Sequence, residues 1–189
     1  MSERPHSKDD AKQGYVVAAL VLIASLGLGL FGLPRLGRHK LDADSPLSGR
    51  PAQDFMLPVF SADGLAKQLR LSDLQGKAVL LDFFASWCGP CREQAPIVER
   101  LAHRLAGPKL AVLGIDTSDQ LMAAQHYYAD SEPSYPILFD GDNLAADAFG
   151  VTGLPTLVLI DKGGVVRGLV SGVVRETELE DLIREAQSH

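Results

Sequence analysis

The feature that most constrains this chain is a pair of cysteines separated by two residues, Cys88 and Cys91, and the chain contains no others. They stand between a nearly continuous apolar run, 78–84, and a segment, 92–106, whose apolar residues recur at the spacing of a half-buried helix. This order of strand, cysteine pair and helix places Cys88 at a helix N-terminus, where free N–H groups and the helix dipole stabilise a thiolate. Cys91, one turn into the helix, can then attack a mixed disulfide formed at Cys88. The pattern predicts thiol–disulfide exchange.

Two other interpretations of the cysteine pair compete with redox chemistry. A structural disulfide between such close neighbours closes almost no loop, so it removes little entropy from the unfolded chain. A zinc site normally needs a second cysteine pair or a histidine pair. His103 and His126 stand singly on predicted helices, which is typical of surface residues. The sequence therefore favours a redox-active disulfide between Cys88 and Cys91, with no metal and no other cofactor.

Several segments resemble the thioredoxin superfamily. Residues 82–91 read DFFASWCGPC, which is similar to the thioredoxin active site, and Pro96 matches the proline that kinks the helix of that family. Residues 150–157, GVTGLPTL, resemble the segment that holds its cis-proline. The wider pattern is closer to the membrane-anchored TlpA/ResA-type thiol oxidoreductases, and it is carried by residues 51–57, 71–77 and 159–164.

Alternating strand and helix patterns predict an α/β fold with parallel strand pairs and a closing antiparallel hairpin. With the resemblance, this becomes a thioredoxin-like fold with an N-terminal β-hairpin and a central helix–strand insertion, 119–139, preceded by a single transmembrane helix. Pro58 should confine the first strand to a sheet edge at best, and Ser118 is placed to cap the helix of the insertion. The expected strands are 55–60, 68–71, 78–84, 110–115, 136–139, 156–160 and 165–170, and the expected helices are 92–106, 119–129, 144–149 and 176–186.

The chain divides into an N-terminal tail (1–14), an apolar run (15–33), a linker (34–50) and the thioredoxin-like domain (51–189). The apolar run is uncharged and long enough to cross roughly 30 Å of hydrocarbon as a helix, which predicts a transmembrane anchor. A cleaved signal peptide is the alternative, but its apolar core normally spans about 7–15 residues and ends in small residues. Large apolar residues continue to the end of this run, so an uncleaved anchor is expected.

Localisation and partners follow from the resemblance rather than from charge. Basic residues flank both ends of the apolar run, so the positive-inside rule does not orient it. TlpA/ResA-type domains lie on the extracytoplasmic or periplasmic face of the bacterial cytoplasmic membrane, which implies a single-pass protein with its catalytic domain there. The implied substrates are disulfide-bearing extracytoplasmic proteins of the cytochrome c maturation or copper-site assembly type, and the implied electron donor is a membrane thiol transducer. The formal net charge of −6 argues against nucleic acid.

The two cysteines are predicted to have different roles. Cys88 is the predicted nucleophile and should be partly exposed, whereas Cys91 resolves the intermediate. Gly89 and Pro90 set the turn that opens the helix, where proline loses no hydrogen bond because first-turn N–H groups are free. This Gly-Pro pair resembles thioredoxin rather than strongly oxidising relatives, which implies a reductant.

A thiol oxidant or a copper(I)-binding module could use the same cysteines. A peroxiredoxin-type peroxidase is discounted, because Ala85 stands where that family has threonine.

Asp82 lies on the predicted buried strand, where desolvation should raise the pKa of a lone carboxyl group. It could then accept the proton of Cys91. The alternative is a strand-end aspartate that reaches solvent. The thioredoxin resemblance places a buried aspartate here and therefore favours the role of proton acceptor.

TlpA/ResA-type sequences usually carry glutamate where this chain has Gln94 and often asparagine where it has Asp82. Glu93 is one position away and should face elsewhere on the helix, so the acceptor is predicted at the thioredoxin location.

Residues around the cysteines are predicted to hold the substrate. By resemblance, a cis Leu154–Pro155 bond presents the backbone of Leu154 to an extended substrate segment; an ordinary trans proline in a loop is the alternative. Trp87, beside the first cysteine, should shield the disulfide and belong to the docking surface together with Gly89 and Pro90, although it could instead fill the core.

Overall fold

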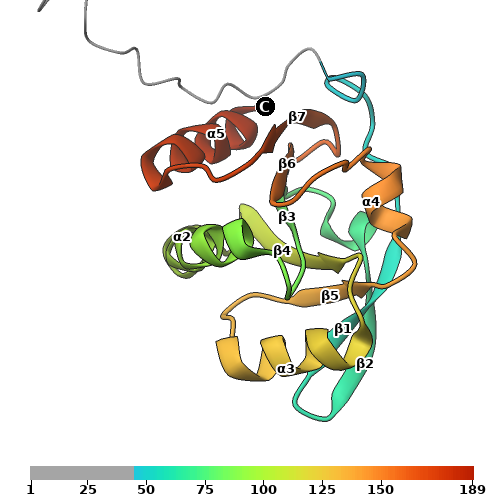
Figure 1. Ribbon diagram of the computed structural model, residues 1–189. Helices are drawn as coiled ribbons and strands as arrows, with labels where there is room; N and C mark the ends of the chain where they lie inside the picture. Colours follow the sequence, from blue (N-terminus) through green and yellow to red (C-terminus); the bar gives the residue numbers. More distant parts are fainter. Residues whose placement is uncertain (1–44) are drawn as a thin grey trace, which may run out of the picture. The chain divides into compact units, whose positions relative to one another are not determined.

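The computed structural model of the protein describes residues 45–189 (Figure 1). The predicted transmembrane anchor, 15–33, therefore lies outside the described residues. Within residues 45–189, no helix is both long and apolar enough to cross a membrane.

A mixed sheet of seven strands, in the order β2-β1-β5-β4-β3-β6-β7, forms the centre of the described region. Strands β3, β4 and β5 are parallel to one another, whereas β1 with β2, β3 with β6, and β6 with β7 pair antiparallel. The predicted N-terminal hairpin, parallel pairs and closing hairpin are thus confirmed. The strands are β1 Met56–Ser61, β2 Gly64–Arg70, β3 Ala78–Phe84, β4 Leu110–Thr117, β5 Ile137–Asp140, β6 Thr156–Ile160 and β7 Val166–Ser171.

Helices cover both faces of this sheet (Figure 1). One face packs against α2, α3 and α5, and the other against α4, the short 3₁₀ helix η1 and the chain before β1. Every residue of β3 is buried, because the strand lies between the two helical layers, and this explains its continuous apolar run. The helices are η1 Leu71–Leu74, α2 Gly89–Leu105, α3 Leu121–Ser131, α4 Leu144–Ala148 and α5 Glu176–Ser188.

Two expectations about the insertion and the first strand are wrong. Strand β1 is not at an edge, because it lies between β2 and β5. Pro58 is tolerated there because the register with β2 shifts between Pro58 and Phe60, and β1 meets β5 through a single residue pair, Val59 with Leu138. Helix α3 begins at Leu121 rather than at residue 119, and Ser118 does not cap it.

Candidate active site

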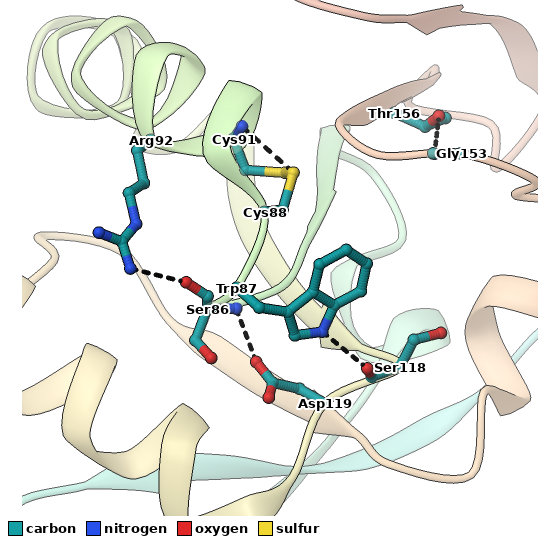
Figure 2. The surroundings of a disulfide bond; sticks show 9 residues. All are labelled: Ser86, Trp87, Cys88, Cys91, Arg92, Ser118, Asp119, Gly153 and Thr156. Atoms are coloured by element: carbon teal, nitrogen blue, oxygen red, sulfur yellow. Dashed lines mark hydrogen bonds between the residues drawn. A yellow bond between two sulfur atoms is a disulfide. The ribbon is translucent and has the colours of Figure 1, made fainter.

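Strand β3 and helix α2 place the two cysteines. Cys88 is the N-cap residue of α2, and its Sγ accepts a hydrogen bond from the backbone N–H of Cys91 at 3.3 Å (Figure 2). Pro90 lies in the first turn, as predicted from its missing N–H group. The two cysteines form a disulfide with an S–S distance of 2.05 Å. The helix N-terminus therefore directs its free N–H groups at the sulfur that should carry the negative charge after reduction.

Solvent access to the sulfurs differs from the prediction. Cys88 is 4% exposed and Cys91 is 2% exposed. The expectation that Cys88 is partly exposed is wrong for this disulfide form, because the residue packs in the same apolar cluster as Phe84 and Cys91. The residues around it are accessible instead, since Gly89 and Pro90 are exposed and Trp87 is 63% exposed. A substrate must therefore reach Cys88 across the surface that these neighbours form.

Asp82 lies on the face of β3 that packs against α2, α3 and α5, and it is 3% exposed. Burial raises the pKa of this carboxyl group to about 7, and its Oδ1 has no hydrogen-bond partner among the described residues. The alternative of an aspartate reaching solvent is therefore wrong. Asp82 and Cys91 line the same cavity of about 280 Å³. This cavity gives the carboxyl group a route to the sulfur that must lose a proton during resolution.

Two tyrosines of the insertion complete the wall of this cavity. Burial raises the pKa of Tyr127, and negative charge on Asp82 or Asp116 raises it further. Burial also raises the pKa of Tyr135 far above its usual value. Both phenols therefore keep their protons near neutral pH. These phenols therefore do not compete with Asp82 for the proton of Cys91, and the other carboxyl group that lines the cavity, Glu99, is only half-buried.

Gln94 occupies the helix position at which TlpA/ResA-type sequences usually carry glutamate. It is fully buried, and its Oε1 accepts a hydrogen bond from the backbone N–H of Val174 at 2.7 Å. Gln94 thus fastens α2 to the segment that precedes α5. Glu93 is exposed, in agreement with the predicted direction of its side chain. The side-chain oxygen of Gln94 is therefore bound to the backbone of Val174. The buried carboxyl group beside Cys91 is that of Asp82.

The loop between β3 and Cys88 is held by hydrogen bonds that the sequence did not predict (Figure 2). The backbone N–H of Ser86 donates to Asp119 Oδ2 at 2.6 Å, and the Trp87 Nε1–H donates to the carbonyl of Ser118 at 3.0 Å. The Arg92 guanidinium donates to the carbonyl of Ser86 at 3.0 Å. These bonds fix the direction in which the loop presents Cys88. No local pattern signals them, because Asp119 follows a different strand from Ser86.

The Leu154–Pro155 peptide bond is cis, as predicted. Pro155 is buried and Leu154 is half-buried. Thr156 Oγ1 donates to the carbonyl of Gly153 at 2.8 Å, which closes the turn around the proline (Figure 2). The role of Leu154 and Pro155 in holding a substrate stays a prediction.

A second buried carboxyl group, Asp116, lies at the end of β4 and escaped the sequence analysis. It is fully buried, and neither of its carboxyl oxygens has a hydrogen-bond partner in the described part of the chain. Burial raises the pKa of Asp116 to about 8, with a further contribution from the negative charge of Asp119. The only sequence signal was its place at the end of an apolar run, which fits many ordinary strand ends.

His103 and His126 are exposed, as expected for surface residues. Across residues 45–189, no group of three or more His, Cys, Asp or Glu side chains is arranged to hold a metal ion.

Comparisons with known proteins agree with this geometry. The model of the AhpC/TSA family matches residues 48–169. The thiol-disulfide oxidoreductase ResA of Bacillus subtilis (strain 168) is 28% identical over 162 residues, which cover 86% of each chain. The thioredoxin-like protein YneN of the same organism is 36% identical over 135 residues, or 70% of this chain and 76% of YneN. Among solved structures, a protein of Chlorobium tepidum assigned as the thiol:disulfide interchange protein DsbE superposes with a TM-score of 0.66 and 31% identity, covering 74% of this chain and 97% of that one.

Proposed function

The chain belongs to the AhpC/TSA family and is a thiol–disulfide oxidoreductase of the ResA/DsbE type, and on this premise we propose that it reduces disulfides of extracytoplasmic proteins. One observation supports a reductant with its own proton acceptor. Cys91 lines a cavity with Asp82, whose buried carboxyl Oδ1 has no hydrogen-bond partner among the described residues. The reaction begins from the dithiol form, in which the N-terminus of α2 stabilises Cys88 as a thiolate.

In the first step, the Cys88 thiolate attacks one sulfur of the substrate disulfide. A Cys88–substrate disulfide forms, the substrate S–S bond breaks, and the second substrate sulfur leaves as a thiolate. The substrate approaches over the accessible surface formed by Trp87, Gly89 and Pro90. The turn at Leu154 and Pro155 is assigned to holding the backbone of the substrate.

In the second step, Cys91 transfers its proton to the Asp82 carboxylate, and the resulting thiolate attacks Cys88 Sγ. The Cys88–Cys91 disulfide forms, and the first substrate sulfur leaves as a thiolate. Two electrons have then passed from the dithiol to the substrate, and Asp82 returns its proton to solvent or to a leaving sulfur. A carboxyl group with a pKa of about 7 suits this task, because near neutral pH it both accepts and releases a proton readily.

The cellular setting is part of the same proposal. The apolar run 15–33 would anchor the protein by a single pass to the bacterial cytoplasmic membrane, with the catalytic domain on the periplasmic or extracytoplasmic face. A membrane thiol transducer would return the Cys88–Cys91 disulfide to the dithiol. Substrates would be proteins whose cysteines must be reduced before haem attachment or copper insertion, as the TlpA/ResA resemblance implies.

A trapping experiment in the native membrane tests this function. A Cys91→Ala variant can form the Cys88–substrate disulfide but cannot resolve it, so the trapped partners identify the substrates. We expect extracytoplasmic proteins with paired cysteines, and no adducts in the Cys88→Ser control. The reduction potential of the Cys88–Cys91 couple tests the direction of transfer. A potential near the DsbA value, about −120 mV, would instead make the protein an oxidant.

A further inference from the structure

Large apolar side chains are exposed at one end of the sheet. Residues 45–189 expose six large apolar side chains, and two of them, Met56 and Leu65, lie on the N-terminal hairpin. The other four follow the carboxyl ends of β3, β4 and β5. Because these strands are parallel, their carboxyl ends meet at the same edge of the sheet, and this edge carries Cys88. We call these four side chains the apolar rim: Trp87 (63% exposed), Leu121 (39%), Met122 (73%) and Leu144 (55%).

Hydrogen bonds between the three loops make the rim a preformed surface. Trp87 Nε1–H donates to the carbonyl of Ser118, as described above. The backbone N–H and the hydroxyl of Ser118 both donate to Asn143 Oδ1 at 2.9 Å. Thr117 Oγ1 donates to the same oxygen at 2.9 Å. Asn143 directly precedes Leu144, and Ser118 lies just before Leu121, so one network ties together the loops that carry the rim.

Negative charge predominates around the rim. From residue 110 to residue 161 the sequence contains no lysine or arginine. Asp142 and Asp147 are exposed on either side of Leu144 along the chain. On the Trp87 side, the exposed Arg92 guanidinium is bound to the carbonyl of Ser86. The surface around Leu144 and the start of α3 therefore combines exposed apolar side chains with an excess of negative charge, which favours a partner that is apolar and basic.

We propose that the apolar rim docks a basic, apolar segment of the polypeptide substrate, next to the disulfide that Cys88 attacks. This inference rests on the proposed function and names the chemistry of its substrate. Cys88 is 4% exposed, so a substrate sulfur reaches it only if the flanking segment lies against the neighbouring surface. Trp87 is the chain neighbour of Cys88 and begins that surface. Tryptophan and methionine are the side chains that contribute most to adaptable apolar recognition.

A second copy of this chain is a poorer occupant of the rim. In a two-fold dimer the same patch would face itself, which would bring Asp142 and Asp147 of both copies to the same interface. Like charges facing each other oppose association, and the formal net charge of −6 adds to this repulsion.

Paired synthetic peptides test the proposal with the full chain. Each peptide carries one internal disulfide flanked by leucines, and it has lysines in one version and glutamates in the other. The reduced protein is mixed with excess peptide, and the single-turnover rate is followed as a function of peptide concentration. We expect the lysine peptide to reach half-maximal rate at a roughly tenfold lower concentration than the glutamate peptide at low salt. Added salt should diminish this preference, because the rim charges are exposed.

Substitutions locate the docking surface. Met122→Gln and Leu144→Gln should each lower the rate with the lysine peptide, relative to bis(2-hydroxyethyl) disulfide, by roughly 3–10-fold. Leu65→Gln is the matched control, because Leu65 is also exposed and apolar but pairs with Phe60 near the turn of the hairpin, away from the carboxyl end of β5, and it should leave this ratio unchanged. An equal effect of Leu65→Gln, or equal rates with both peptides, would overturn the proposal. A wild-type dimer that Met122→Gln dissociates would assign the rim to a second copy instead. If the wild type fails to reduce even the small disulfide, the proposed function itself is wrong.

Discussion

Asp82 and Asp116 are two buried carboxyl groups on the same face of the sheet, yet they occupy different surroundings. Asp82 pairs in register with Gly114 of β4, and Asp116 lies two residues further along that strand, so both side chains point toward the α2 and α3 layer. The space over Gly114 is filled by side chains of the neighbouring residues, because a Cβ there would lie 2.4 Å from Ile137 Cδ1. Burial raises the pKa of both groups, to about 7 for Asp82 and about 8 for Asp116.

The difference between them lies in what each carboxyl group can reach. Asp82 shares a cavity with Cys91, whereas Asp116 is not among the residues lining that cavity. Asp116 instead lies near Asp119, which holds the backbone of Ser86. A raised pKa alone therefore does not identify a proton acceptor for the thiol. Access to the sulfur does identify it. Access assigns proton transfer to Asp82, whereas Asp116 is a carboxyl group buried behind the active-site loop.

The largest expected effect separates these two roles directly. Asp82→Asn removes the proposed acceptor and should slow the resolving step near neutral pH by about 100-fold. Asp116→Asn should stay within about threefold of the wild type, because it leaves the cavity beside Cys91 intact. Single-turnover oxidation of the reduced protein by a peptide disulfide measures both rates. Glu93→Gln serves as a surface control and should have little effect. Equal losses in Asp82→Asn and Glu93→Gln would remove Asp82 from the mechanism.

The pH profile sharpens the same distinction. Only the ionised form of Asp82 can take a proton from Cys91, so the rate of the resolving step should rise as pH increases through about 7. The rise should disappear in Asp82→Asn and persist in Asp116→Asn. A stopped-flow series from pH 5 to 9 measures the profile. A rise that survives in Asp82→Asn would mean that another group, such as the Cys88 thiol, determines it.

The dependence of stability on pH tests the burial of Asp116. The pKa of Asp116 is raised above its unfolded value, so the folded state holds the proton more tightly than the unfolded state. Its contribution to stability is therefore complete below about pH 4 and is lost as pH rises toward about 8. Asp116→Asn has no such loss, so its free energy of unfolding relative to the wild type should improve between pH 4 and pH 9, by up to about 6 kcal/mol for a shift of roughly four pKa units. Urea titrations of the disulfide form at both pH values measure this. A constant difference would show that Asp116 is hydrated in the folded state.

The sequence predicted the site best where local pattern and chemistry coincide. The apolar run of β3 revealed both the buried strand and Asp82, because a carboxyl group inside such a run is conspicuous. The order of strand, cysteine pair and helix placed Cys88 at the start of α2. The positions that were missed depend on contacts between distant segments. Asp119 meets Ser86 only because β3 and β4 are adjacent and parallel.

The errors at Pro58 and Cys88 have a similar origin. Proline in a strand signals an edge only if the neighbouring strand needs the missing N–H, and β5 meets β1 through one residue pair. The exposure of Cys88 depends on how closely Phe84 and Cys91 pack around it, which spacing in the sequence does not determine. Local pattern thus predicted element types and the reactive pair, while tertiary packing decided strand order and access to the sulfurs.

The smallest expected effect concerns the hydrogen bond by which Asp119, near Asp116, holds the active-site loop. Asp119→Ala removes the acceptor of the Ser86 N–H, a charge-assisted bond of 2.6 Å, while Trp87 keeps its bond to the Ser118 carbonyl. The loop should then open more often, and amide exchange at Ser86 should accelerate by about tenfold. Asp142→Ala, an exposed aspartate on the neighbouring loop, is the matched control and should leave this amide unchanged. Hydrogen exchange of the disulfide form followed by NMR measures the rate at this single amide. Unchanged protection in Asp119→Ala would mean that Trp87 and Arg92 hold the loop without it, and that the charge beside Asp116 has no part in presenting Cys88.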